Sequence, residues 1–284
     1  MFQLGVFADD IDQDLHHALE VAAELGVQWI EIRGAWGKNL IDHDSQTVRA
    51  VRDAIDARGM RVRCVAAPLL KAKLRGQGES RELFNARARD TLEGQLEILQ
   101  RAIAIARQFN TNLVRCFSFW KIGDDPTTIW HDLIAEMQPI VRAAERAGII
   151  LAMENDFECN IGTGVWAARF IQAVGSPNLR LLWDPGNAYF SGEREPYPSG
   201  YEHVKSFIVH VHIKDAAFDP TTGTYRWVVN GTGEVDLLGQ LRALKRDGYA
   251  GVITMENHYT PPGGTKEAGV RECFAGLQKL LAQV

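Results

Sequence analysis

The segment Ile208-Val209-His210-Val211-His212-Ile213-Lys214-Asp215 alternates apolar and polar side chains over most of its length. Neighbouring side chains of a β-strand point to opposite faces, so His210, His212 and Lys214 share one face. The odd-numbered positions from 209 to 213 are all aliphatic and suit contact with a layer of helices. The pattern therefore predicts a strand whose polar face points towards the interior of a sheet structure.

Seven other short apolar segments resemble this one, and several of them also end in polar residues. They are residues 2–8 (FQLGVFA), 29–34 (WIEIRG), 61–68 (RVRCVAAP), 112–119 (NLVRCFSF), 149–156 (IILAMEND), 179–186 (LRLLWDPG) and 251–258 (GVITMENH). Alternating strands and helices need crossover connections and therefore a parallel sheet. Eight such units without a break in composition favour one domain over residues 1–284, a closed (β/α)8 TIM barrel.

Amphipathic segments between these strands predict the helices of the barrel. The segments are 14–25, 45–58, 87–109, 127–147, 165–174, 237–247 and 266–282. Four of them are followed by glycines that can adopt the left-handed cap conformation, namely Gly26, Gly59, Gly148 and Gly248. The stretch 191–201, rich in Gly, Pro and charge, predicts a long loop in place of a sixth helix.

The composition favours an ordinary globular enzyme. The chain has 284 residues, of which 46% are hydrophobic and 24% charged, and its formal net charge of −5 argues against nucleic-acid binding. The four cysteines are widely spaced and predict buried or semi-buried thiols of a reducing compartment. No signal-peptide pattern or apolar run long enough to cross a membrane is present, which predicts a cytoplasmic protein without membrane contact.

Carboxylates and an imidazole stand at the ends of four consecutive predicted strands. Glu154, Asp184, His212 and Glu256 should therefore converge at the carboxyl-terminal mouth of the barrel, where active sites of this fold lie. Crowded carboxylates repel one another, and a divalent cation relieves that repulsion. Three carboxylates and one imidazole suit one Mn²⁺, Mg²⁺ or Co²⁺, with zinc and iron as alternatives. Taken singly, each residue also fits a structural role, as Asp184 fits a turn before Pro185-Gly186.

Several motifs resemble those of the xylose isomerase-like TIM-barrel superfamily, the sugar-phosphate isomerase/epimerase group. The matching motifs are Met153-Glu154-Asn155, Trp183-Asp184-Pro185-Gly186-Asn187, His210-Val211-His212-Ile213-Lys214-Asp215, Gly231-Thr232-Gly233-Glu234-Val235-Asp236 and Gly248-Tyr249-Ala250-Gly251 leading to Thr254-Met255-Glu256. The resemblance extends over essentially the whole chain. It implies a role in carbohydrate metabolism and implies that Glu154, Asp184, His212 and Glu256 are the metal ligands. Because members of the group are often dimers or tetramers, it leaves a homo-oligomer open.

The sequence departs from two branches of that superfamily. Ketohexose epimerases of the group carry a His where this chain has Asn187 and a substrate-binding Glu where it has Asn160. The apurinic endonucleases need extra His ligands, and the ends of the predicted third and fourth strands carry no His. These departures argue against a simple ketohexose C3-epimerase and against DNA repair.

The residues predict proton transfer on a small polyhydroxy carbonyl compound through an enediolate intermediate. Glu154 and Glu256 are the candidate bases, which would make the protein a metal-dependent isomerase or epimerase of a sugar, sugar acid or sugar phosphate. The candidate substrate contacts are Asn187, Lys214, His258, Arg33 and Glu31. Lys214 could instead pair with Asp215 or Glu234, and Glu31 with Arg33. The alternatives are a dehydratase of an inosose or a dehydroshikimate-like substrate and a non-catalytic sugar-binding barrel.

Overall fold

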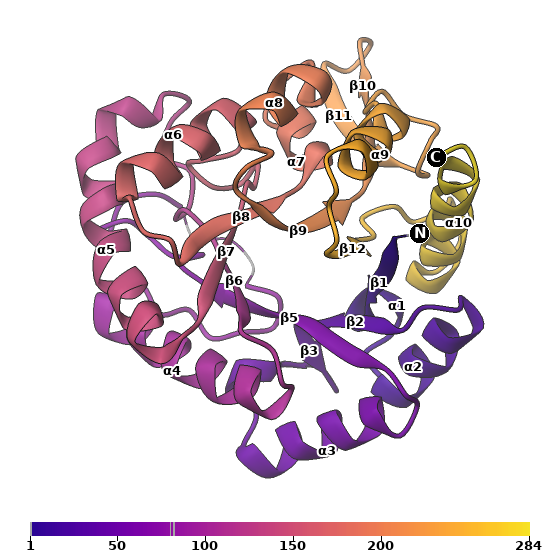
Figure 1. The fold of residues 1–284 in the computed structure, drawn as a ribbon, viewed down its shortest axis with the longest axis horizontal. Helices are drawn as coiled ribbons and strands as arrows, with labels where there is room; N and C mark the ends of the chain where they lie inside the picture. The colour runs from indigo at the N-terminus through magenta and orange to yellow at the C-terminus, as the bar shows by residue number, and fades with distance from the viewer. Residues whose placement is uncertain (1, 80, 82) are drawn as a thin grey trace.

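Eight parallel strands close into a barrel in this computed structural model, which describes residues 2–79, 81 and 83–284 (Figure 1). Around the barrel the order is β1-β12-β9-β8-β7-β6-β5-β2, so strands that follow one another along the chain pair in space. The barrel strands are β1 (Gln3–Phe7), β2 (Trp29–Ile32), β5 (Arg61–Leu69), β6 (Leu113–Cys116), β7 (Ile150–Glu154), β8 (Leu179–Trp183), β9 (Ile208–Ile213) and β12 (Val252–Met255). The predicted (β/α)8 TIM barrel and its eight strands are confirmed.

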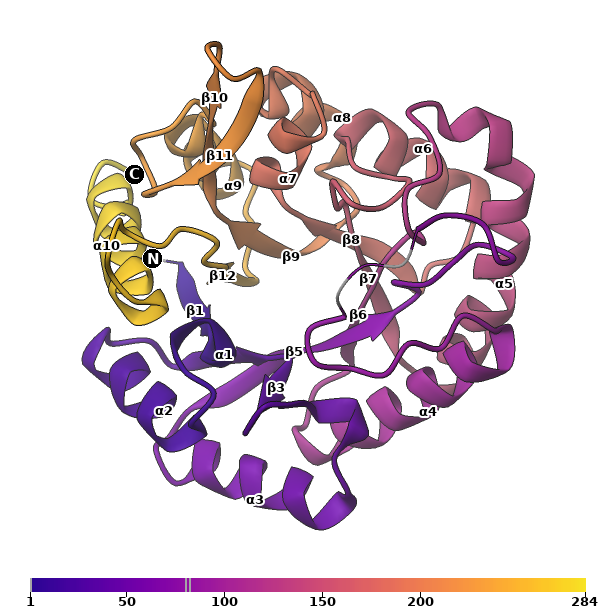
Figure 2. The same cartoon turned by 180° about the vertical axis from the view of Figure 1, so that it is seen from behind.

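Helices surround the barrel on its outside, as both views of the ribbon show (Figures 1 and 2). The longer ones are α2 (Leu15–Glu24), α3 (Ser45–Asp56), α4 (Leu92–Gln108), α5 (Trp130–Ala147), α6 (Gly164–Val174), α9 (Leu237–Arg246) and α10 (Lys266–Leu281). Short helical turns complete the layer: α1 (Ala8–Ile11), η1 (Leu40–Asp42), η2 (Pro126–Ile129), α7 (Pro185–Phe190), η3 (Pro196–Gly200) and α8 (Tyr201–Val204).

Local signals account for where most of these helices begin and end. Thr91 caps α4 by accepting a hydrogen bond from the amide of Gly94, so this helix starts later than predicted. Such a cap is worth about 1 kcal/mol. Gly148 ends α5 in the left-handed conformation, as predicted. The predicted loop 191–201 is wrong in part, because residues 196–200 form the π-helical turn η3 and α8 begins at Tyr201.

Two antiparallel hairpins, neither of which was predicted from the sequence, follow barrel strands at the carboxyl-terminal mouth. The first consists of β3 (Gly34–Ala35) and β4 (Lys38–Asn39) and follows β2. The second consists of β10 (Asp215–Asp219) and β11 (Thr224–Val228) and follows β9. Asp215 fixes the loop behind the second hairpin by accepting hydrogen bonds from the amides of Gly231 and Gly233, at 2.8 and 2.9 Å.

The core has two parts, which separate the helix layer from the barrel interior. Most apolar side chains pack between the strands and the helices. A small second group lies on the inward face of neighbouring strands and consists of Cys64, Leu113, Ala152 and Leu182. Two positions further along the chain stand the polar residues Arg115 on β6, Glu154 on β7 and Asp184 just after β8. The apolar layer therefore lies directly below the polar mouth. The four cysteines are buried and free, and no described helix is long and apolar enough to cross a membrane.

Candidate metal centre

The four residues predicted to converge do meet at the carboxyl-terminal mouth of the barrel. Glu154 ends β7, Asp184 follows β8, His212 lies in β9 and Glu256 follows β12. One nitrogen or oxygen atom from each side chain lies within 4.8 Å of those of the other three. All four side chains are buried, with exposed fractions of 3% or less. Four ligand atoms this close together could hold a single cation, with three carboxylate ligands and one imidazole ligand.

The ring of His212 is held in an orientation that suits a metal ligand. Its Nδ1 faces the group, 3.3 Å from Oε1 of Glu154 and 3.8 Å from Oε2 of Glu256. Its Nε2 lies on the other side, 3.1 Å from Oε2 of Glu31. Metal-bound histidines usually donate their second ring N–H to a carboxylate, which fixes the tautomer. His210 Nε2 lies 2.7 Å from the same oxygen of Glu31, so this carboxylate contacts both histidines.

Asp184 is fixed at its backbone and at one carboxylate oxygen. Its amide donates to Oδ1 of Asn155, and the Asn155 side-chain amide donates to its carbonyl, both at 2.8 Å. The Oδ1 atom of Asp184 accepts from the amide of Asn187 at 2.8 Å. Its Oδ2 is buried without a hydrogen bond of acceptable geometry among the described residues, although Lys214 Nζ is 2.9 Å away. This oxygen could act as a ligand atom if a bound cation took the place of the Lys214 ammonium beside it.

Three buried cations surround the carboxylates. Lys214 Nζ donates a short hydrogen bond to Glu256, and it lies 4.0 Å from Oε1 of Glu154. Arg115 Nη1 lies 3.1 Å from Oε2 of Glu154 and 3.8 Å from Oε1 of Glu256. Arg33 Nη1 donates to Glu256 at 3.1 Å. Each cation thus orients a candidate ligand, and together they lower the repulsion among the carboxylates.

The pKa values of three candidate ligands are shifted in different directions by burial and by the neighbouring charges. Burial and the carboxylate of Glu256 raise the pKa of Glu154, but His212 and Arg115 outweigh them and lower it to about 2. Burial lowers the pKa of His212, but Glu31 and Glu154 more than offset this and raise it to about 10. Burial raises the pKa of Asp184 to about 6, against the opposing charge of Lys214. A cation and a proton would therefore compete for His212, so raising the pH favours the cation.

Three of the predicted substrate contacts, His258, Asn187 and Lys214, lie against the candidate ligands. His258 stands beside the group, with Nε2 3.6 Å from Glu256 and a side chain that is 29% exposed. Asn187 donates to Oε1 of Glu154 at 3.1 Å and so also orients a candidate ligand. Lys214 pairs with Asp184 and Glu256, so the alternative prediction of a pair with Asp215 or Glu234 is wrong.

Glu31 and Arg33 differ most from their predicted arrangement. The alternative prediction that they pair with each other is wrong, because each has other partners. Glu31 is fully buried and contacts His210 and His212. Arg33 contacts the carboxylates of Asp9, at 2.8 Å, and Asp10, in addition to Glu256. Each side chain therefore contacts a candidate ligand: Glu31 contacts His212, and Arg33 contacts Glu256.

Sequence reasoning missed Asp9, Asp10 and the aromatic residues of the β10–β11 hairpin. The two aspartates follow β1 directly and lie in the short helix α1, so their position at a strand end was a usable signal. The hairpin also had a signal, because Asp219-Pro220 and Gly223 mark a turn between two short segments of strand-forming residues. One residue of this hairpin, Trp227, has its ring 5.3 Å from Lys214 Nζ.

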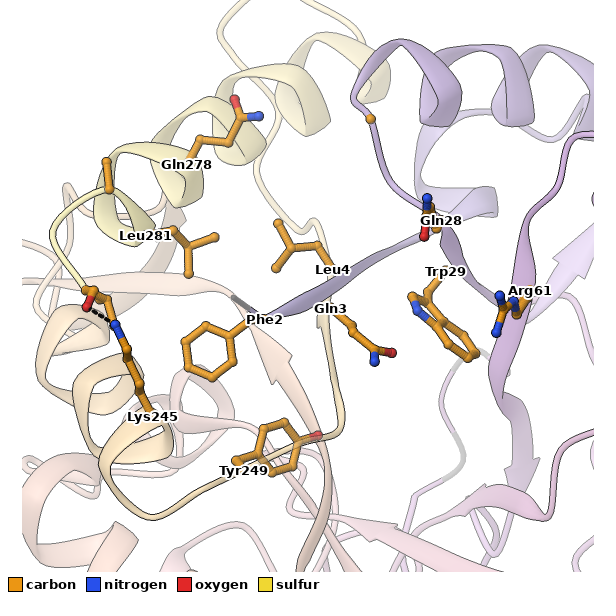
Figure 3. Close-up of a pocket in the computed structure, with 13 residues that line it drawn as sticks. Phe2, Gln3, Leu4, Gln28, Trp29, Arg61, Lys245, Tyr249, Gln278 and Leu281 are labelled. Carbon is orange, nitrogen blue, oxygen red and sulfur yellow. Dashed lines mark hydrogen bonds between the residues drawn. The ribbon is translucent and has the colours of Figure 1, made fainter.

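A separate cavity of about 1000 Å³ opens at the opposite, amino-terminal end of the barrel. Figure 3 shows Phe2, Leu4, Tyr249 and Leu281 around it, with Lys245 at its edge. Active sites of this fold lie at the other end, where the carboxylates meet. The metal centre, and not this cavity, is therefore the candidate site.

A curated relative matches part of the chain. An uncharacterised protein of Methanocaldococcus jannaschii is 26% identical over 173 residues, which are 60% of this chain and 55% of that protein. The match therefore spans about half the length of this relative.

Solved structures match nearly the whole chain. The IolI protein with a bound zinc atom is 18% identical, with a TM-score of 0.73 over 99% of this chain and 98% of that chain. The 3-keto-D-glucoside 4-epimerase of E. coli is 15% identical, with a TM-score of 0.72 over 99% and 100%. A probable 3-DHS dehydratase of Bacillus anthracis is 15% identical, with a TM-score of 0.72 over 98% of each chain. At these identities the likeness establishes the fold alone.

A family model covers almost the same extent. The model described as xylose isomerase-like TIM barrel matches residues 19–279, which is most of the chain. The barrel topology and the strand-end carboxylates agree with that match. This protein therefore belongs to the xylose isomerase-like TIM-barrel family.

Proposed function

We propose that this protein is a metal-dependent isomerase or epimerase that transfers a proton on a small polyhydroxy carbonyl compound. One observation carries the proposal. Glu154 and Glu256 come from β7 and β12, the outer two of four consecutive barrel strands, and Asp184 and His212 lie between them. Two carboxylates thus approach one point from opposite flanks. That arrangement suits removal of a proton on one side of a substrate carbon and its return on the other.

The surrounding side chains support this division of roles. A divalent cation bound by Glu154, Asp184, His212 and Glu256 would act as a Lewis acid for the substrate oxygens. Arg115 fixes the direction of Glu154, and Arg33 fixes that of Glu256. Lys214 supplies a positive charge beside the same carboxylates and can balance negative charge that develops on a substrate oxygen. His258 is partly exposed at the edge of the group and suits contact with a hydroxyl.

The similar structures support a metal-dependent reaction of this kind. One is named as an epimerase of a keto sugar, one carries zinc, and one is named as a probable dehydratase. Proton abstraction next to a carbonyl is common to epimerisation, aldose–ketose isomerisation and loss of a β-hydroxyl. Product analysis distinguishes these outcomes after the abstraction step has been detected.

The test is proton exchange in D₂O. Protein reconstituted with Mn²⁺, and in parallel with Mg²⁺, is incubated with a panel of ketoses, aldoses, keto-glycosides and inososes, and the compounds are examined by NMR. We expect deuterium at a carbon next to the carbonyl of at least one compound. Glu154→Gln should lower the exchange rate by about 100-fold or more, because general-base catalysis contributes that much. The exposed control Glu20→Gln should leave it unchanged. Full exchange by Glu154→Gln would remove this residue from proton transfer.

A further inference from the structure

Aromatic side chains gather beside the candidate metal centre, on the hairpin β10–β11 and the elements packed against it. We call this group the aromatic cluster; it consists of Phe157, Tyr189, Phe190, Phe218, Tyr225 and Trp227. Neighbouring ring centroids are 4.1 to 5.8 Å apart. The rings of the cluster thus support one another by direct packing.

Trp227 is a member of the cluster that also neighbours polar residues of the site. Phe190 stacks on it at 4.1 Å with an angle of 13° between the planes, so one face of the indole is covered. The imidazole of His258 lies 5.0 Å from it, and the ammonium of Lys214 lies 5.3 Å from its centroid. Because Phe190 occupies one face, the opposite face is the one that can meet these two polar groups. The side chain is only half-buried.

Both polar neighbours of Trp227 also contact the candidate ligands. Lys214 lies 2.9 Å from Asp184 and donates to Glu256, and His258 lies 3.6 Å from Glu256. The face of the indole that is turned away from Phe190 therefore borders residues next to the metal centre. A small molecule bound at the carboxylates would have charged and polar groups on one side and a flat apolar wall on the other. Small-molecule sites commonly combine such a wall with a few polar groups.

We propose that Trp227 is the platform for the apolar face of a cyclic polyol, and that the substrate binds in its ring form. This inference rests on the proposed function and narrows its substrate class. A six-membered polyol ring presents a rigid face of C–H groups that matches the area of an indole. An acyclic polyol has no permanent apolar face, and ordering its rotatable bonds on the ring would cost conformational entropy. Trp227, rigidly supported by Phe190, thus favours cyclic keto-polyols and keto-glycosides over acyclic ketoses.

The test compares two polyols that have the same number of carbons and hydroxyls, cyclic myo-inositol and acyclic sorbitol. Binding to the Mn²⁺-reconstituted protein is measured by titration calorimetry, and binding to the Mg²⁺ form by saturation-transfer NMR. We expect myo-inositol to bind more tightly and to receive saturation. Trp227→Ala should weaken its binding about 3- to 10-fold, Trp227→Phe should retain most of the affinity, and metal affinity should not change. Trp36→Ala serves as the control, because Trp36 is exposed and its ring neighbours are His16 and His43.

Three results would overturn the inference: equal or tighter binding of sorbitol, no binding of either polyol, or unchanged myo-inositol affinity in Trp227→Ala. Thermal unfolding of each variant shows whether the hairpin substitution has disturbed the fold, and Trp227→Phe gives a second, milder test. Metal affinity and deuterium exchange are measured on the same samples. Exchange on acyclic ketoses alone would contradict the ring-form substrate and leave the proposed function standing. If the wild-type protein neither binds the metal nor catalyses exchange on any compound, the proposed function itself is contradicted.

Discussion

The Oε2 atom of Glu31 lies 3.1 Å from Nε2 of His212, on the side of the imidazole that faces away from Glu154 and Glu256. This contact ties the second barrel strand to the strand that carries the candidate imidazole ligand. It leaves Nδ1 facing the carboxylates. The ligand geometry of the site therefore depends on a residue that would not itself touch the metal.

Replacing Glu31 by Gln should weaken metal binding. The amide lacks the negative charge that strengthens the hydrogen bond to Nε2 and favours donation from that atom, so His212 loses orientation and basicity. We expect the Kd for Mn²⁺ to rise about 10- to 100-fold in titration calorimetry. Glu20→Gln, on the exposed surface of α2, is the matched control. An unchanged Kd in Glu31→Gln would show that the contact does not orient the ligand.

Lys214→Met should destabilise the metal-free protein. The substitution leaves Asp184 and Glu256 buried without the ammonium that contacts both. Removing one partner of a buried ion pair costs about 3–5 kcal/mol. Urea unfolding should show a loss of this size in the free energy of unfolding of the variant. Added Mn²⁺ should restore more stability to this variant than to the wild type, because the cation replaces the lost charge. Equal stabilisation of both proteins by Mn²⁺ would contradict this view of Lys214.

Gly186→Ala should disturb the site through packing. A Cβ at this position would lie 2.7 Å from the carbonyl oxygen of Lys214 and 3.2 Å from Oδ1 of Asp184. The backbone must shift, at a cost of about 1–3 kcal/mol in the free energy of unfolding. Gly123→Ala is the control, because a Cβ there meets no heavy atom within 4 Å. Equal unfolding free energies for the two variants would show that the turn after β8 is not constrained.

The sequence predicted the barrel and the meeting point of the four residues for a simple physical reason. Alternation along each strand determines which side chains point inward, and a closed parallel barrel brings all strand ends to one mouth. Glu154, Asp184, His212 and Glu256 each follow from their own strand. Their convergence therefore needed no knowledge of individual contacts.

Contacts between distant segments could not be predicted in this way. The inward direction of Glu31 and Arg33 was clear from β2, but their partners come from β9, α1 and the end of β12. Which partner an inward side chain meets depends on the stagger of the strands and on side-chain rotamers. The hairpin β10–β11 was missed for another reason: its turn residues were present, but the eight-unit pattern assigned that stretch to a connection.

The most direct test of the metal centre is the metal content of the wild-type protein beside that of His212→Ala and Asp184→Ala. Each protein is dialysed against Mn²⁺, and bound metal is determined by elemental analysis and by calorimetric titration, with the exposed His203→Ala as control. We expect about one ion per chain in the wild type and the control, and a loss of at least about 100-fold in affinity in the two ligand variants. A wild-type protein that binds no divalent cation, or a His212→Ala variant that binds it equally well, would contradict the assignment of this centre.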